Sequence, residues 1–268
     1  MAPITRFINR RVLDNWEEAL GRLDLNPYES AALRTALEAM ESLIHARDEV
    51  DRIRGHVNRA DGSTQWYKPT TYQQKQLFRA VSSFFDAYYT AVSTWSGVVA
   101  RFSSVFGRNF SDNKPFLDWF RDAFPEQPLA YTELERARLF RALLSHPQQF
   151  PVYSWATYAA QVDPLLRIVV WGPAGRGTRR MPEGAVDNHP GAEQFGDWQF
   201  EAPDEVSVTN SVGILGVAIL ATILSRRTQG SAFARPISFE RAIEILEPDM
   251  DVSEAARGWH RISDLLGN

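Results

Sequence analysis

The stretch Thr71–Val105, TYQQKQLFRAVSSFFDAYYTAVSTWSGVVARFSSV, is dense in large apolar residues. They recur every three or four positions, which is the spacing of one face of an α-helix. Because so many of them share a wide face, we expect this helix to pack against neighbours on more than one side. The stripe comprises Leu77, Val81, Phe84, Phe85, Tyr88, Tyr89, Val92, Trp95, Val98, Val99 and Phe102.

A second long helix is predicted before this stretch. Asn26, Pro27 and Glu29 form a strong start signal, since they supply a capping side chain, a first-turn proline and a charge that favours the helix N-terminus. The helix is expected to reach about Val57, and the polar segment Asn58–Thr64 follows it as a turn. Two long helices that run antiparallel across a short turn are the frame of a helical bundle.

The remaining segments complete a mainly α fold with a β-hairpin insertion and C-terminal helices. The β-branched and aromatic segment Leu165–Trp171 predicts a strand, and the alternating segment Asp197–Ala202 predicts its return strand. Further helices are expected over Arg11–Leu23, Lys114–Phe124, Ser154–Gln161, Asn210–Arg227, Ser238–Leu246 and Ser253–Leu266. The predicted organisation is a bundle over residues 1–162, a hairpin with an Arg-rich loop over 163–205, and a buried helix with C-terminal helices over 206–268, packed on the same bundle.

The helix at Asn210–Arg227 is apolar throughout its centre. Its continuous apolar core is about fourteen residues, whereas a bilayer-spanning helix needs about twenty. We therefore interpret it as a buried core helix, and its Gly213 and Gly216 suit close packing against other helices.

The segment Thr132–Pro147, TELERARLFRALLSHP, carries the candidate catalytic residues Arg141 and His146. Thr132 and Glu135 have the spacing of a capping box, and Pro147 ends the helix. On a straight helix Arg141 and His146 lie about 140° apart, so they share a site only if the end of the helix unwinds. The alternative is a solvated arginine and a histidine that complements the helix dipole.

The pattern from about residue 28 to residue 162 resembles the HEPN family of helical-bundle ribonucleases, in which an arginine precedes a histidine at a helix end. The resemblance implies a homodimer that cleaves RNA without metal. Arg141 would stabilise the negative charge of the transition state, and His146 would act as general base or acid. Ala142 stands where active members usually carry a polar residue, so the resemblance also covers an inactive, RNA-binding member.

The same resemblance implies a setting in a toxin–antitoxin system or in phage defence, with a protein partner such as an antitoxin. A second interpretation comes from a different class of protein. In it the chain is a non-enzymatic helical protein–protein interaction module, and Arg141 and His146 point into solvent or away from each other.

The loop Gly172–Arg180 follows the predicted strand and superficially approaches a phosphate-binding P-loop. A P-loop needs Lys followed by Ser or Thr and then a helix, and this chain offers Thr178-Arg179 and no helix-compatible continuation. The loop is either a nucleic-acid-binding segment or a solvated hairpin tip. In the first case its phosphate contacts come from Arg167, Arg176, Arg179 and Arg180.

Composition narrows the classes of chemistry. The 268-residue chain has no cysteine, which excludes disulfides, thiol catalysis and thiolate metal sites. Its net charge of −4 gives no overall attraction to nucleic acid, so a local basic patch must supply it. Arginine far outnumbers lysine, which reflects either coding bias or bidentate phosphate contacts. Residues Met1–Arg11 lack the apolar run of a signal peptide. We expect a cytoplasmic protein that needs no cofactor, metal or membrane.

Overall fold

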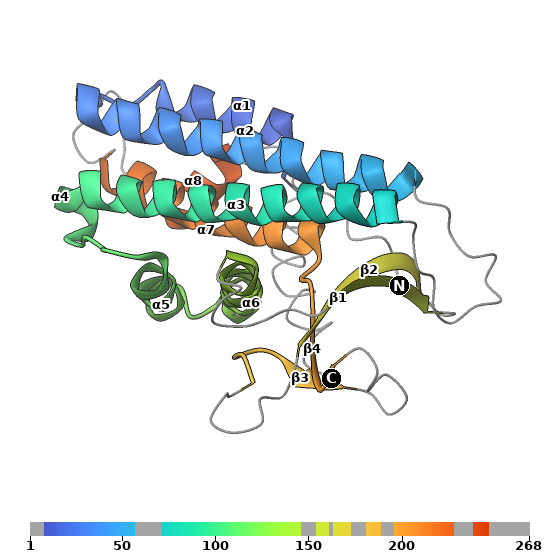
Figure 1. Cartoon of the computed structure of the whole chain (residues 1–268). Coiled ribbons are helices and arrows are strands. Elements are labelled where there is room, and N and C mark those ends of the chain that lie inside the picture. The colour runs from blue at the N-terminus through green and yellow to red at the C-terminus, as the bar shows by residue number, and fades with distance from the viewer. Residues whose placement is uncertain are drawn as a thin grey trace. The chain divides into compact units, whose positions relative to one another are not determined.

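The computed structural model describes residues 8–56, 71–145, 154–160, 163–172, 181–188, 196–227 and 238–246. The fold is a helical bundle with a small antiparallel sheet, which confirms the predicted mainly α class (Figure 1). The elements, in chain order, are α1 (Arg10–Leu20), α2 (Pro27–His56), α3 (Thr71–Arg101), α4 (Ser103–Phe106), α5 (Asn113–Ala123), α6 (Pro128–Ser145), β1 (Ser154–Ala160), β2 (Asp163–Gly172), β3 (Val186–Asp187), β4 (Trp198–Glu201), α7 (Glu205–Arg227) and α8 (Phe239–Leu246). The turn predicted over residues 58–64 and the helix predicted over residues 253–266 lie outside the described residues.

Helix α2 begins where the sequence predicts. The side-chain oxygen of Asn26 accepts hydrogen bonds from the backbone N–H groups of Tyr28 and Glu29, each at 3.0 Å. The Glu29 carboxylate accepts the Asn26 backbone N–H at 3.2 Å. This reciprocal arrangement satisfies backbone donors that no helical carbonyl can reach.

Helix α6 begins four residues earlier than predicted, so the expected capping box of Thr132 and Glu135 is wrong. The helix starts at Pro128, whose fixed φ suits the first turn and whose missing N–H is not needed there. Inside the helix, the Thr132 hydroxyl donates to the Pro128 carbonyl at 2.9 Å. Glu135 instead forms an ion pair with Arg138 at 2.7 Å.

The sheet contains the predicted hairpin and extends beyond it. Strand β2 pairs antiparallel with β4, with Gly172 opposite Trp198, and the strand order is β1-β2-β4-β3. The helix predicted over Ser154–Gln161 is wrong, because this segment forms β1 and places Ser154 opposite Trp171 of β2. Aromatic and β-branched residues in SWATYAA favour a strand once a partner strand is present.

The chain divides into two compact units, each built from separated segments. Unit 1 consists of Met1–Ile44, Tyr88–Leu134 and Val206–Asn268, and unit 2 of His45–Ala87 and Glu135–Glu205. The division of the chain into parts at 162 and 205 that the sequence suggests remains a prediction.

In unit 1, helix α7 packs closely against two tryptophans. Trp16 of α1 and Trp95 of α3 are fully buried and meet edge to face, with their ring centroids 6.1 Å apart. A Cβ atom at position 216 would lie 2.7 Å from the Trp95 ring, so this contact requires glycine. One turn earlier in α7, a Cβ atom at position 213 would come even closer to the side chain of Ile8.

Helix α7 is long and apolar enough to cross a membrane by length and composition, with a mean hydropathy of 1.9 over its most apolar window. Of that window, 72% is buried inside the protein. This burial agrees with the prediction of a core helix. A long and uniformly apolar composition is also common in the central helices of soluble bundles.

Candidate functional site

The candidate site starts from an aromatic cluster in unit 2. Phe140 of α6 is fully buried between Phe85 of α3 and Phe200 of β4, with ring centroids 4.8 Å and 5.4 Å away. Phe84 adds an edge-to-face contact with Phe85 at 5.1 Å. Closely packed rings of this kind restrict the positions of the helices and the strand that carry them, because the protein interior has few voids.

Arg141 and Asp86 are the sequence neighbours of two of these buried phenylalanines. The Arg141 Nε–H donates to the Asp86 carboxylate at 3.2 Å. The Arg141 side chain is 27% exposed and that of Asp86 is 64% exposed. The contact between Phe85 and Phe140 therefore brings Asp86 and Arg141 together, and it places a guanidinium at the half-exposed surface of α6.

Other arginines of α6 are engaged in structural contacts. Arg136 donates to the backbone carbonyl of Glu201 at 3.2 Å and so ties α6 to the end of β4. Arg138 forms a two-point interaction with Glu135, with both distances at 2.7 Å, and the two side chains are largely buried. These contacts hold the helix that presents Arg141.

The second predicted catalytic residue, His146, lies outside the described residues. Helix α6 is helical as far as Ser145, one turn beyond Arg141. Ala142 is half-buried on this last turn. The structure therefore fixes the position of Arg141 and brings it together with Asp86.

The four predicted RNA contacts belong to the hairpin region. Arg167 lies in β2, where its Cα is opposite that of Tyr158 in β1. Its side chain lies outside the described part of the chain, and so do Arg176, Arg179 and Arg180 in full. Their role in binding phosphate stays a prediction.

Asp86 is the residue of this site that sequence reasoning missed. It lies 55 positions before Arg141, so no local spacing connects the two residues. One signal was present in the sequence: Asp86 is an acidic residue within an otherwise apolar and aromatic run, SSFFDAYY. An acidic residue in such a run often has a specific partner.

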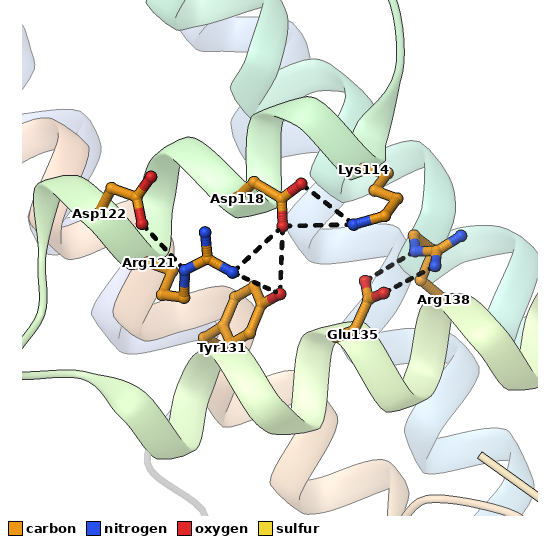
Figure 2. A network of polar contacts seen from close by, with 7 residues as sticks. All are labelled: Lys114, Asp118, Arg121, Asp122, Tyr131, Glu135 and Arg138. Atoms are coloured by element: carbon orange, nitrogen blue, oxygen red, sulfur yellow. Dashed lines mark hydrogen bonds and ion pairs between the residues drawn. The ribbon is translucent and has the colours of Figure 1, made fainter. Parts of the chain in front are cut away.

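A polar network on α5 and α6 is the other prominent group of charged side chains (Figure 2). Within unit 1, the Asp118 carboxylate accepts from Lys114 at 3.0 Å and from the Tyr131 hydroxyl at 3.2 Å. Arg121 lies 3.6 Å from Asp118 and over the Tyr131 ring at 5.2 Å. The cations are matched by carboxylates, and we interpret the network as a link that holds α5 against the start of α6.

This network predicts a pH-dependent contribution to stability. The hydrogen bond from Lys114 lowers the pKa of Asp118. The stabilisation is therefore present above the ordinary aspartate pKa, near 4, and is lost as the pH falls through the lower pKa of the folded protein. We expect Asp118→Asn to lower the melting temperature at pH 7 and to have a progressively smaller effect as the pH falls below about 4.

The matched control for this prediction is Asp122→Asn. Asp122 is more exposed and pairs with Arg121 at 2.9 Å. Its replacement should lower the melting temperature at pH 7 by less than that of Asp118. A melting-temperature difference for Asp118→Asn that stays constant between pH 2 and pH 7 would contradict the assignment.

No group of three or more His, Cys, Asp or Glu side chains within the described ranges is arranged to hold a metal ion. Comparison of the chain with protein-family models, with curated proteins and with solved structures finds no match.

Proposed function

We propose that this protein is a HEPN-like, metal-independent RNA endonuclease, or an RNA-binding member of that group, with Arg141 and His146 as its catalytic residues. The observation that carries the proposal is the position of Arg141. Its guanidinium is held by Asp86 at a half-exposed surface, five residues before His146 in the sequence. A fixed, accessible guanidinium suits the recognition of a phosphate.

The proposed reaction is transesterification within the RNA. His146 removes a proton from a ribose 2′-hydroxyl, and the 2′-oxygen attacks the adjacent phosphorus. The bond from phosphorus to the 5′-oxygen breaks, and protonated His146 returns the proton to that oxygen, directly or through a water molecule, to complete the leaving group. The products are a 2′,3′-cyclic phosphate and a 5′-hydroxyl, so no redox partner or metal is needed.

Arg141 contributes charge stabilisation in this scheme. Negative charge builds up on the non-bridging oxygens as the 2′-oxygen attacks, and a guanidinium provides planar donors for them. Asp86 is a positioning residue, because its bond to Nε restricts the rotation of the guanidinium plane. A preset orientation reduces the reorganisation that the reaction requires.

The remaining parts of the proposal concern binding partners. RNA is held by Arg167, Arg176, Arg179 and Arg180, and the active protein is a homodimer in the cytoplasm. A toxin–antitoxin or phage-defence setting would add a neutralising protein partner. Measurement of the molar mass in solution, with and without a short RNA, tests the dimer directly.

The experiment that tests the proposed function is an RNA-degradation assay with EDTA present. We expect the wild-type protein to cleave RNA and His146→Ala to lose cleavage, because imidazole titrates near neutral pH and other side chains do not replace it. His260→Ala is the matched control and should cleave normally. A wild-type protein that never cleaves RNA, or a His146→Ala variant that cleaves normally, would refute the enzymatic proposal.

Binding assays separate the two forms of the proposal. If the wild-type protein retains RNA in a gel-shift assay but does not cleave it, the protein is an RNA-binding member, in line with Ala142. If it neither binds nor cleaves RNA, the alternative of a protein–protein interaction module takes its place.

A further inference from the structure

A candidate binding surface outside the Arg141 region is a groove between α1 and α2, within unit 1. It has a volume of about 530 Å³, which is in the usual range for ligand sites. Its walls run from Arg10 to Gly21 on one side and from Ser30 to Glu41 on the other. At 1.5 Å per residue, each wall is about 16 Å long, the length of three helical turns.

The floor of the groove is made of leucines from both helices and from the loop that joins them. Most are buried, whereas Leu25 and Leu37 are half-exposed and offer apolar surface to an occupant. The leucines are Leu13, Leu20, Leu23, Leu25, Leu33 and Leu37. Such a floor favours an occupant with an apolar face.

The rim of the groove is acidic. Its four carboxylates belong to Asp14, Glu17, Glu38 and Glu41, and its two guanidiniums to Arg10 and Arg34, which leaves an excess of two negative charges. Arg10 and Glu41 pair with each other at 3.5 Å. The carboxylates of Asp14, Glu17 and Glu38 form no ion pair or hydrogen bond with other described residues.

We propose that this groove binds a basic amphipathic helix of a partner protein. The length of the groove matches three turns of helix. The leucine floor matches an apolar stripe at positions i, i+3, i+4 and i+7, and the carboxylates match flanking Lys or Arg residues. A compact organic cation would fill only part of so long a groove. The inference is independent of the proposed RNA chemistry, because it uses neither Arg141 nor His146.

The test uses a fluorescent synthetic peptide of four helical turns, with leucine at i, i+3, i+4 and i+7 and lysine on both flanks. Binding is measured by fluorescence anisotropy with the full-length protein. The groove variant carries Asp14→Asn, Glu17→Gln and Glu38→Gln. The matched control carries Glu126→Gln, Glu183→Gln and Asp187→Asn, which removes the same charge from exposed positions elsewhere.

We expect the groove variant to bind the peptide at least tenfold more weakly than the wild type, and the control variant to stay within twofold. A scrambled peptide of the same composition, which has no apolar stripe, should also bind at least tenfold more weakly. The absence of peptide binding, equal loss in the two variants, or equal affinity for the scrambled peptide would overturn the proposal.

Two further arms identify other occupants. In the first, the apolar residues Trp259 and Ile262 near the C-terminus are both changed to Glu in the full chain, which should not alter peptide affinity. A tenfold gain in peptide affinity would show that the chain's own C-terminal segment occupies the groove, and it would overturn the proposal of a partner protein. In the second, the molar mass of the groove variant is compared with that of the wild type. A groove variant that dissociates from dimer to monomer would assign the groove to a second copy and overturn the proposal likewise.

Discussion

Arg141→Ala is expected to lower the rate of RNA cleavage by roughly 10²–10³-fold, in the range seen when one donor to a developing oxyanion is removed. The reason is the loss of a guanidinium that is already oriented by its hydrogen bond to Asp86. Single-turnover cleavage of a defined RNA measures the effect. Arg108→Ala, at an exposed arginine, is the control and should cleave at the wild-type rate.

Two further variants separate charge from geometry. Arg141→Lys should recover little activity, because a point charge does not replace a planar group with several donors. Asp86→Asn should lower kcat more than it raises KM, because it removes the carboxylate that orients the guanidinium but leaves the charge of Arg141. If Arg141→Ala keeps the wild-type rate, Arg141 has no catalytic role. If Arg141→Lys is fully active, the positive charge at this position is sufficient and the planar guanidinium is not required.

Among the substitutions proposed here, Glu205→Ala is expected to destabilise the fold most, with a loss of about 3–5 kcal/mol in the free energy of unfolding. In unit 2, Arg54 Nη2 lies 2.9 Å and 3.0 Å from the two oxygens of Glu205. The two side chains are only 13% and 3% exposed. Burial raises the pKa of Glu205, and the charge of Arg54 opposes that change. Removal of the carboxylate leaves a buried guanidinium without its main partner.

Urea denaturation measures this effect, with Glu49→Ala as the control. Glu49 pairs with Arg52 at 2.6 Å, but both side chains are about half-exposed, so its replacement should change stability much less than that of Glu205. The double variant Arg54→Met with Glu205→Met should be more stable than Glu205→Ala, since it removes both buried charges. Equal losses in the free energy of unfolding for Glu205→Ala and Glu49→Ala would show that the buried ion pair contributes no more to stability than an exposed one.

Local sequence signals predicted the parts of the fold that depend on neighbouring residues. Asn26, Pro27 and Glu29 mark the start of α2 because the three groups interact within one turn. The strands β2 and β4 were predicted because each carries its own β-branched or aromatic pattern. The start of α6 was misplaced, because Thr132 and Glu135 match a capping pattern that the helix starting at Pro128 overrides.

The features that sequence reasoning missed depend on contacts between distant residues. Strand β1 is a strand because β2 lies beside it, and its own short sequence does not decide between helix and strand. Arg54 and Glu205 are 151 positions apart, and Asp86 and Arg141 are 55 apart. No periodicity or spacing rule connects such pairs, so only the tertiary structure brings Asp86 into the candidate site.

Unit 1 is built from three separated segments of the chain, which affects how it folds while it is being synthesised. When the ribosome has translated the chain as far as Leu134, two of the three segments of unit 1 exist, but the one that begins at Val206 does not. Trp16 and Trp95 then lack the glycine face of α7 against which they pack. Many chains fold their N-terminal domain while the rest is still being made. In this chain α1 and α3 cannot complete their packing until α7 has been synthesised. We therefore expect Trp16 and Trp95 to stay partly exposed in the nascent chain until that helix has left the ribosome.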